Sequence, residues 1–236
     1  ETAYYDAVIS EYFNKTSKIY FHKKKVIYGN IIEKLRYGEN PHQESAIYSQ
    51  NQNLGINKIH GKSLSYNNYN DIFSALTISK SLPQNTGTVI VKHANPCGVS
   101  ILKNNINSYK SALACDPLSA FGGVISCNFK VTKNLALELN KIFIEVIIAN
   151  GFDYNALKIL KFKKNLRIID ASNFSLNEMF RLNSTNKYLL IQSEDKKIFT
   201  KSDFRIVSKK KPNKSQFEKL LFGFNICKHG KSNARV

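Results

Sequence analysis

The chain has 236 residues, 42% of them hydrophobic and 11% aromatic, and a formal net charge of +18. This content suffices for the core of one large domain or two small ones, and it excludes an intrinsically disordered protein. No apolar run approaches the roughly 20 residues of a membrane helix, and the first residues lack the basic and apolar regions of a signal peptide. We therefore expect a cytoplasmic protein that does not enter a membrane.

The positive charge suggests nucleic-acid binding, which is the common function of strongly basic domains. Here, however, the lysines are scattered along the chain, and the densest clusters fall in separate segments at 23–25, 161–164 and 209–211. Short charge runs of this kind usually form solvated surface. A basic nucleic-acid-binding module remains an alternative, but we expect no nucleic-acid partner and only a positive field that favours small anionic substrates.

The four cysteines show no spacing typical of a metal site. Most of them lie in apolar strand or helix patterns. We therefore expect free, buried thiols in a reducing compartment.

Apolar residues recur at helical or strand spacing along most of the chain. Predicted helices cover 6–13, 72–82, 108–114, 135–144, 155–161 and 215–227, with Asp71 and Ser215 as N-caps of the second and last. Predicted strands cover 25–32, 89–91, 124–127, 146–149, 166–169, 189–192 and 204–208. This alternation, without an internal repeat, predicts an α/β fold in which a parallel or mixed sheet is flanked by helices.

The uncharged, β-branched run at 89–91 predicts a buried strand that ends in Lys92 and His93, because a turn-forming Asn-Pro-Cys-Gly segment follows. In open α/β sheets, ligands bind beyond the carboxyl ends of the strands, so this pair is a candidate site. Other predicted strands end near Gly151 and Asp170, and we expect all these ends to converge at one end of the sheet. The alternative is a surface lysine beside a structural histidine.

Polar segments are further candidates. The segment 35–43 carries Arg36 and Tyr37 in a turn-rich loop, where functional groups are common, although a plain surface turn is an equal alternative. The segment 61–70 is a second polar stretch. The segment 116–123 ends in two glycines, which either let a backbone approach a ligand or simply form a turn.

These motifs, taken in order, resemble the transformylase portion of the bifunctional purine-biosynthesis enzymes that pair AICAR formyltransferase with IMP cyclohydrolase. The matching segments are 35–43, 61–68, 91–99, 116–123 and 228–234. The resemblance covers essentially the whole chain, and even the helix at 6–13 is similar to the junction helix that precedes the transformylase domain.

The resemblance implies a fold built from cytidine-deaminase-like α/β units. By this interpretation 1–24 form the junction helix and linker, 25–195 the first unit, and 196–236 the truncated start of a second unit, while the cyclohydrolase domain is absent. The segment from His93 to Cys97 is superficially similar to the zinc-deaminase signatures. Because Asn95 replaces the glutamate and no second cysteine follows at the required spacing, we predict no metal site.

The implied reaction is formyl transfer from 10-formyltetrahydrofolate to the 5-amino group of AICAR. This amine is a weak nucleophile, so the reaction needs a base for its proton and a cation for the tetrahedral oxyanion. His93 fits the base and Lys92 the cation. Successive strand residues point to opposite faces, so both can serve one site only if the strand has ended at Lys92.

The resemblance also implies that Arg36 and Tyr37 contact the AICAR nucleotide, with the guanidinium suited to its phosphate. Gly151, Asp170 and Asn233 would be further substrate-binding residues. The family assembles its sites in a homodimer. Because the chain starts and stops abruptly, we expect a piece of a longer protein that is inactive alone or part of a split enzyme; a non-catalytic remnant with an exposed half-core is a further alternative.

Overall fold

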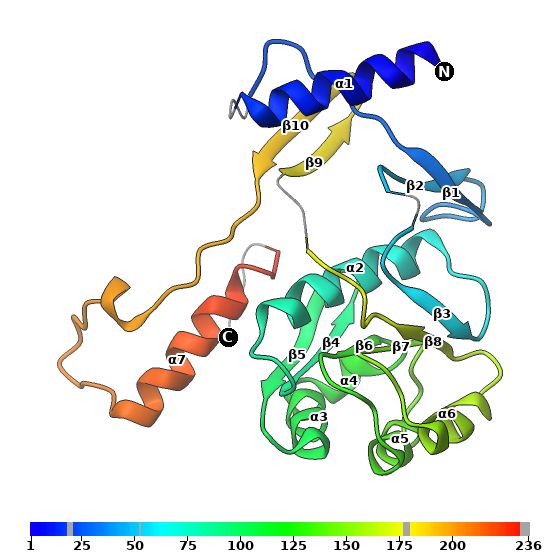
Figure 1. The fold of residues 1–236 in the computed structure, drawn as a ribbon. Coiled ribbons are helices and arrows are strands. Elements are labelled where there is room, and N and C mark those ends of the chain that lie inside the picture. The colour runs from blue at the N-terminus through cyan, green and yellow to red at the C-terminus, as the bar shows by residue number, and fades with distance from the viewer. Residues whose placement is uncertain (18–20, 52, 177–179, 232–236) are drawn as a thin grey trace.

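In a computed structural model of the chain, residues 1–17, 21–51, 53–176 and 180–231 are described. At the centre lies a six-stranded mixed sheet with the strand order β3-β8-β7-β6-β4-β5 (Figure 1). Its strands are β3 (Asn57–His60), β4 (Gly87–Lys92), β5 (Asn95–Ile101), β6 (Val124–Cys127), β7 (Val146–Ala149) and β8 (Arg167–Asp170). A mixed sheet flanked by helices is the fold class that the sequence predicts.

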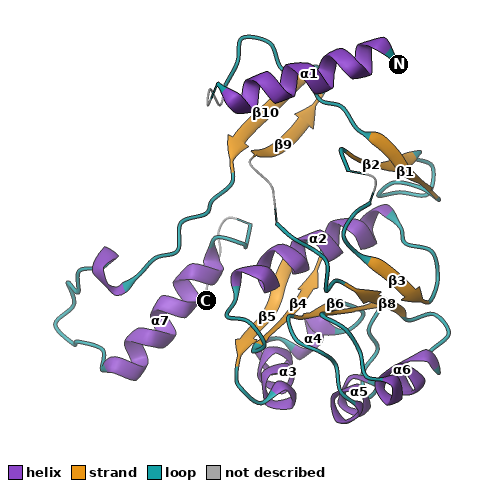
Figure 2. Cartoon of the chain, in the orientation of Figure 1, coloured by secondary structure: helices purple, strands orange, loops and turns teal. Residues whose placement is uncertain are grey.

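Helices cover both faces of this sheet (Figure 2). Helix α2 (Tyr66–Ser81) packs on one face, where Val89 and Val91 of β4 point. On the other face, Ile90 packs with α3 (Asn105–Cys115), α5 (Lys133–Leu139) and α6 (Tyr154–Lys161). The strands are therefore buried on both sides, which explains why they carry uninterrupted apolar runs instead of alternating ones. The short helix α4 (Pro117–Ala120) precedes β6.

Strand direction decides which residues meet at each end of the sheet. Strands β6, β7 and β8 are parallel to one another, whereas β4 is antiparallel to β6, with Val91 opposite Val124. The carboxyl end of β4 thus lies where β6–β8 begin; we call this the Lys92 end. The strands β7 and β8 finish at the opposite end, the Asp170 end. The predicted convergence of His93, Gly151 and Asp170 at one end is therefore wrong, because a short apolar run looks the same in either direction.

Several predicted helix boundaries were also wrong, and in two helices the reason is a side-chain cap further upstream. Helix α2 begins at Tyr66, where Ser65 and Asn68 form a capping box, and Asp71 lies inside the helix. Helix α7 (Lys214–Cys227) is capped by Asn213, not by Ser215. Helix α5 ends at Leu139, short of the predicted residue 144, and the next residues are a turn.

Strands were harder to predict outside the core. The first predicted strand starts later, as β1 (Asn30–Leu35), which pairs only with β2 (Ser45–Ser49). Strands β2, β3, β5 and β9 (Phe180–Thr185) were not predicted, whereas β10 (Tyr188–Ser193) was. Residues 204–208 form no strand. Strands β2 and β5 are mostly half-buried, β3 is partly so and β9 is mostly exposed, so their apolar residues show no simple burial pattern.

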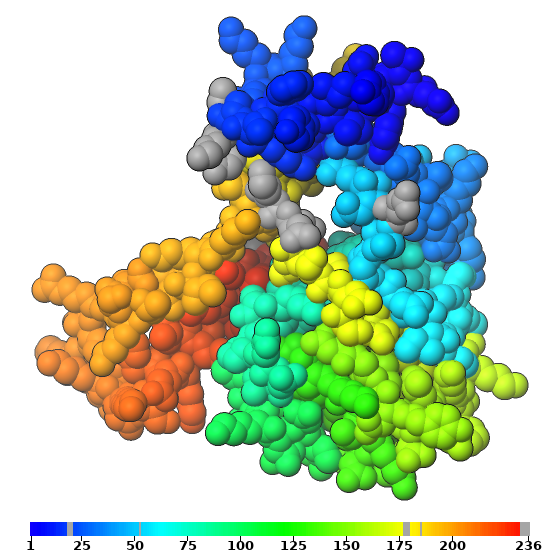
Figure 3. All heavy atoms as spheres, in the orientation of Figure 1, coloured from blue at the N-terminus to red at the C-terminus, as the bar shows by residue number. Residues whose placement is uncertain are grey.

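Helix α1 (Thr2–Thr16) lies above the main sheet, next to the β9–β10 hairpin and the β1–β2 pair (Figures 1 and 3). It contacts the β1–β2 region through polar bonds, from Asn30 Nδ2 to the Tyr4 hydroxyl (2.9 Å) and from Gln50 Nε2 to Glu11 Oε2 (3.1 Å). Among the described residues, no helix combines the length and apolarity that crossing a membrane requires.

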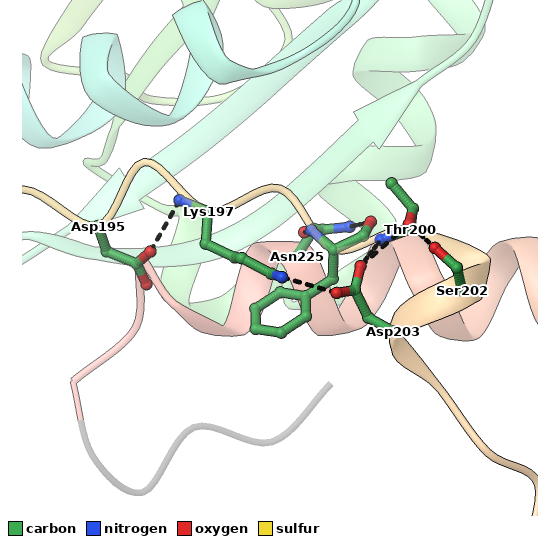
Figure 4. A network of polar contacts seen from close by, with 7 residues as sticks. Asp195, Lys197, Thr200, Ser202, Asp203 and Asn225 are labelled. Atoms are coloured by element: carbon green, nitrogen blue, oxygen red, sulfur yellow. Dashed lines mark hydrogen bonds and ion pairs between the residues drawn. The ribbon is translucent and has the colours of Figure 1, made fainter.

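A polar network fastens the segment before α7 onto that helix (Figure 4). Asn225 receives a bond from the Phe199 N–H (2.8 Å) and donates to the Phe199 carbonyl (2.9 Å). Asp203 accepts bonds from Lys197 Nζ (2.6 Å) and the Thr200 N–H (2.7 Å), and these bonds lower the pKa of its carboxyl to about 2. Asp203 therefore stays ionised near neutral pH and keeps the segment folded on itself, while Asn225 attaches the segment to α7.

The C-terminal end of α7 is joined to α2 through His229, whose Nε2 lies 3.3 Å from the Ser81 hydroxyl oxygen. Burial, with help from the charge of Lys228, lowers the pKa of His229 to about 4. At pH values between about 6.5, the ordinary pKa of histidine, and about 4, this imidazole is protonated in the unfolded chain and neutral in the folded chain. The contribution of His229 to the stability of the folded chain is therefore fully present above about pH 6.5 and is lost as the pH falls toward 4.

We expect the free energy of unfolding to fall by about 2 kcal/mol between pH 7 and pH 4.5 through this group, after allowance for solvent screening. His229→Gln should remove this part of the pH dependence, as measured by urea unfolding at several pH values. The exposed His42 offers a control for the loss of an imidazole as such, through the variant His42→Gln. Equal slopes in His229→Gln and the unchanged chain would contradict the prediction.

Candidate active site

Lys92 and His93 lie at the tip of the hairpin that joins β4 to β5. Lys92 pairs with Asn95, so the two residues between them, His93 and Ala94, form the whole connection. Both have positive φ angles, 54° and 56°. Two-residue hairpin turns of this kind prefer Asn-Gly, because a side chain costs about 1–2 kcal/mol per residue in the left-handed region. The turn is thus held in place by its surroundings and not by its own sequence.

The predicted condition for a shared site is met, because β4 ends at Lys92. The His93 side chain is exposed, whereas Lys92 is half-buried. The Lys92 ammonium donates a hydrogen bond of 2.8 Å to the Phe121 carbonyl, in the segment 116–123. A Cβ on Gly123 would lie only 3.0 Å from the Val91 carbonyl oxygen, so the second glycine lets this segment pack against β4.

Helix α2 contacts the turn from the other side. Asp71 Oδ1 accepts a bond of 2.6 Å from the Ala94 N–H, and the Ser74 hydroxyl donates to the Ala94 carbonyl at 3.1 Å. Burial raises the pKa of the Asp71 carboxyl, although the bond from Ala94 and the charge of His93 partly oppose this effect. Neither residue was among the predicted site residues.

An ion pair between a buried arginine and a partly exposed glutamate lies at the same end of the sheet. Arg167, which is 8% exposed, donates from Nε to the Ser63 carbonyl (3.1 Å), and its Nη1 lies 3.7 Å from Glu145 Oε2. The same Glu145 oxygen accepts a bond of 3.1 Å from Asn68 Nδ2. Desolvation lowers the pKa of Arg167, and the nearby charge of Arg36 adds to this effect. In the sequence, the signal for this pair was an arginine within a predicted strand that otherwise has the apolar residues of a buried strand.

Arg36 and Tyr37 belong to a loop that follows β1 and closes on itself, with a bond of 2.7 Å from the Gly38 N–H to the Gln43 carbonyl. The Arg36 guanidinium lies 5.3 Å from the centre of the Tyr37 ring. The loop contacts the first turn of α2, where Asn67 Nδ2 donates to the Glu39 carbonyl at 3.4 Å, so it lies at the Lys92 end. The structure thus places four of the predicted residues at the same end of the sheet: Lys92 and His93 at the end of β4, and Arg36 and Tyr37 near the start of β8, which β6 and β7 separate from β4.

Gly151 and Asp170 lie instead at the Asp170 end. Gly151 follows β7 with a φ of 96°, and Asp170 Oδ1 accepts bonds from the Ser172 N–H (2.9 Å) and the Ser172 hydroxyl. The half-buried Lys80, which was not predicted, donates there to Asn150 Oδ1 (3.3 Å) and to the Ala171 carbonyl (3.4 Å). The predicted Asn233 lies outside the described residues.

A family model described as the AICARFT/IMPCHase bienzyme matches residues 1–236. The chain belongs to this family. Relatives named bifunctional purine biosynthesis protein PurH match along the whole chain, with 42% identity for the one from Leptospira biflexa and 40% for the one from Aquifex aeolicus. The relative from Caulobacter vibrioides is 38% identical.

The chain spans about half the length of the curated relatives it matches, 46% of the Leptospira biflexa protein and 47% of the Aquifex aeolicus protein. The AICARFT/IMPCHase family resemblance inferred from the motifs is therefore confirmed, and so is the expectation that the chain corresponds to a portion of such proteins. Within the described part of the chain, no group of three His, Cys, Asp or Glu residues is arranged to hold a metal ion.

Proposed function

We propose that the chain takes part in formyl transfer from 10-formyltetrahydrofolate to the 5-amino group of AICAR, a step of purine nucleotide synthesis. The observation that carries this proposal is the Lys92–His93 hairpin tip, with its exposed histidine, in a chain that belongs to the AICARFT/IMPCHase family. The products are the formylated nucleotide and tetrahydrofolate. The reaction would take place in the cytoplasm, where the thiols of the chain stay reduced.

In this mechanism His93 is the general base. Its exposed imidazole is free to approach a bound nucleotide and to accept a proton from the AICAR amine as the amine nitrogen attacks the formyl carbon. When the tetrahedral intermediate collapses, the bond between the formyl carbon and N10 of the folate breaks. The same imidazolium can return the proton to N10, so the proton count balances.

Lys92 stabilises the oxyanion of that intermediate. Its ammonium is already oriented by the bond of 2.8 Å to the Phe121 carbonyl, so less side-chain entropy is lost when the negative oxygen forms. Two further donor positions of the ammonium remain for a ligand, because Lys has three N–H groups. Fixed donors of this kind contribute more than mobile ones.

Arg36 and Tyr37 would bind the nucleotide at the same end of the sheet. A guanidinium suits the dianionic phosphate because it offers parallel donors. The Arg167–Glu145 pair beside the loop supports this assignment, because it adds a second guanidinium, which the 3.7 Å contact with Glu145 neutralises only in part.

Gly151 and Asp170 cannot join that site within one chain. The four residues of β7 separate the two ends by about 13 Å, and both faces of the sheet are covered by helices. If Gly151 and Asp170 bind substrate, they act in a site completed by another copy. We therefore propose a homodimer in which the Asp170 end of one copy faces the Lys92 end of the other.

Mixing two inactive variants tests this arrangement. We expect His93→Ala and Asp170→Ala each to abolish most formyl transfer. In the proposed dimer each site takes His93 from one copy and Asp170 from the other, so either variant removes one residue from every site. In a mixture refolded together, half of the dimers are mixed, and each of these holds one intact site. Activity should return to about one quarter of the unchanged level. No recovery, alongside mixed dimers detected by mass spectrometry, would contradict the shared site.

These assays need the remainder of the family's protein, because we expect the chain alone to be inactive. By this proposal 1–24 are the junction segment, 25–195 one complete unit and 196–236 the start of another. A chimera in which the chain replaces the matching segment of the Aquifex aeolicus relative supplies the rest. Tetrahydrofolate release should be seen spectroscopically with the chimera and not with the chain; a folded chimera without turnover would overturn the proposed function.

A further inference from the structure

The His93–Ala94 turn presents the proposed base in a backbone conformation that its own residues disfavour. Both residues lie in the left-handed region, where glycine and asparagine are the usual occupants. Neither histidine nor alanine has a local reason to remain there. Something outside the hairpin must therefore stabilise this conformation.

Two side chains of α2 provide that stabilisation by holding both polar groups of one residue. Asp71 accepts from the Ala94 N–H at 2.6 Å, and Ser74 donates to the Ala94 carbonyl at 3.1 Å. Residues three apart lie on the same helix face, so the pair forms one clamp across the Ala94 backbone. Asn95 adds a weaker bond, 3.4 Å from its Nδ2 to the His93 carbonyl.

Asp71 is not needed by its own helix. The N-terminus of α2 is already satisfied by the capping box of Ser65 and Asn68, and Asp71 lies further along the helix. Desolvation disfavours its carboxylate, so the position costs stability. The hydrogen bond that Asp71 accepts from the turn explains why a carboxylate occupies this half-buried position although desolvation disfavours it.

We propose that Asp71 and Ser74 are positioning residues that hold the His93–Ala94 turn left-handed and thereby fix the direction of the His93 imidazole. The proposal rests on the proposed function, because it gives His93 its role as base. It predicts that loss of the clamp lowers kcat more than it raises KM for the nucleotide, because Arg36 and Tyr37 belong to a separate loop.

The first test uses the 236-residue chain itself. In Asp71→Ala we expect the Ala94 amide to exchange with deuterium about 10- to 100-fold faster, since it loses a charge-assisted bond. The His93 imidazole resonance should broaden or split in the NMR spectrum. Adding Ala94→Gly should restore one sharp resonance, because glycine adopts a positive φ without support.

The second test measures formyl transfer in the chimera. Asp71→Ala should lower kcat by about 10- to 100-fold, as expected for a misplaced catalytic group, and Ala94→Gly in the same protein should recover most of it. Thr77→Ala is the matched control on α2, because its hydroxyl bonds the Phe73 carbonyl of its own helix. We expect the control to leave exchange, resonance and kcat unchanged.

The outcomes separate the two proposals. Unchanged exchange and an unchanged His93 resonance in Asp71→Ala would overturn the clamp, and so would a loss that Ala94→Gly does not recover. If Asp71→Ala fails to fold, Ser74→Ala, which removes the weaker of the two bonds, should give the same changes at smaller size; no change there would also overturn it. An intact clamp in a chimera without any turnover would instead contradict the proposed function.

Discussion

His93→Ala is expected to lower kcat of formyl transfer in the chimera by about 10²- to 10⁴-fold, the usual effect of losing a general base. Lys92→Ala should cost about 10²- to 10³-fold, because the oxyanion loses one fixed donor. The two losses should not multiply, since both residues act on the same transition state. The measurement is the initial rate of tetrahydrofolate release at saturating substrates.

Folding should not explain these losses. The His93 side chain is exposed, and replacing it removes no packing from the core. Circular dichroism and the urea midpoint of His93→Ala should therefore match those of the unchanged chimera. The control His22→Asn removes an imidazole from the segment between α1 and β1 and should keep full activity. Formyl transfer that survives both Lys92→Ala and His93→Ala would refute the assigned mechanism.

The sequence predicted the central strands well because burial on both faces leaves an unmistakable apolar run. Strands β6 and β7 have the predicted boundaries, 124–127 and 146–149. The sequence did not predict the strand directions, since an apolar run does not show in which direction its strand crosses the sheet. The segment after Ala94 was interpreted as a stop, whereas it forms β5, which turns back on β4. That error reversed β4 relative to its neighbours, so that Gly151 and Asp170 were expected at the end of the sheet where His93 lies.

The candidate site was predicted through its motifs more than through its geometry. Lys92 and His93 were found because polar residues ended an apolar strand. Asp71 was noticed as well, but as a helix cap, because an aspartate before an apolar helical pattern usually has that role. Its contact with Ala94 joins residues 23 positions apart, and a separation of that kind leaves no local pattern.

Gly98→Ala is expected to lower the free energy of unfolding by about 3 kcal/mol or more. A Cβ at this position would lie 1.9 Å from the Ala112 carbonyl oxygen and 2.8 Å from the Ala112 carbonyl carbon. Both atoms are backbone of α3, so no side-chain rotation relieves the clash. Strand β5 and helix α3 would have to separate, and urea unfolding measures the cost as a lower midpoint.

A second glycine distinguishes this clash from backbone strain. Gly151 has a φ of 96°, but the nearest atom to an added Cβ is Lys130 Cγ at 3.8 Å. Gly151→Ala should therefore cost only about 1–2 kcal/mol, from the left-handed conformation alone. Because β5 carries one side of the hairpin, Gly98→Ala should also disturb His93 and lower formyl transfer in the chimera. Equal losses of stability in the two variants would show that α3 can move away from β5 at little cost in free energy. The close approach of β5 to α3 would then not determine the position of the Lys92–His93 turn.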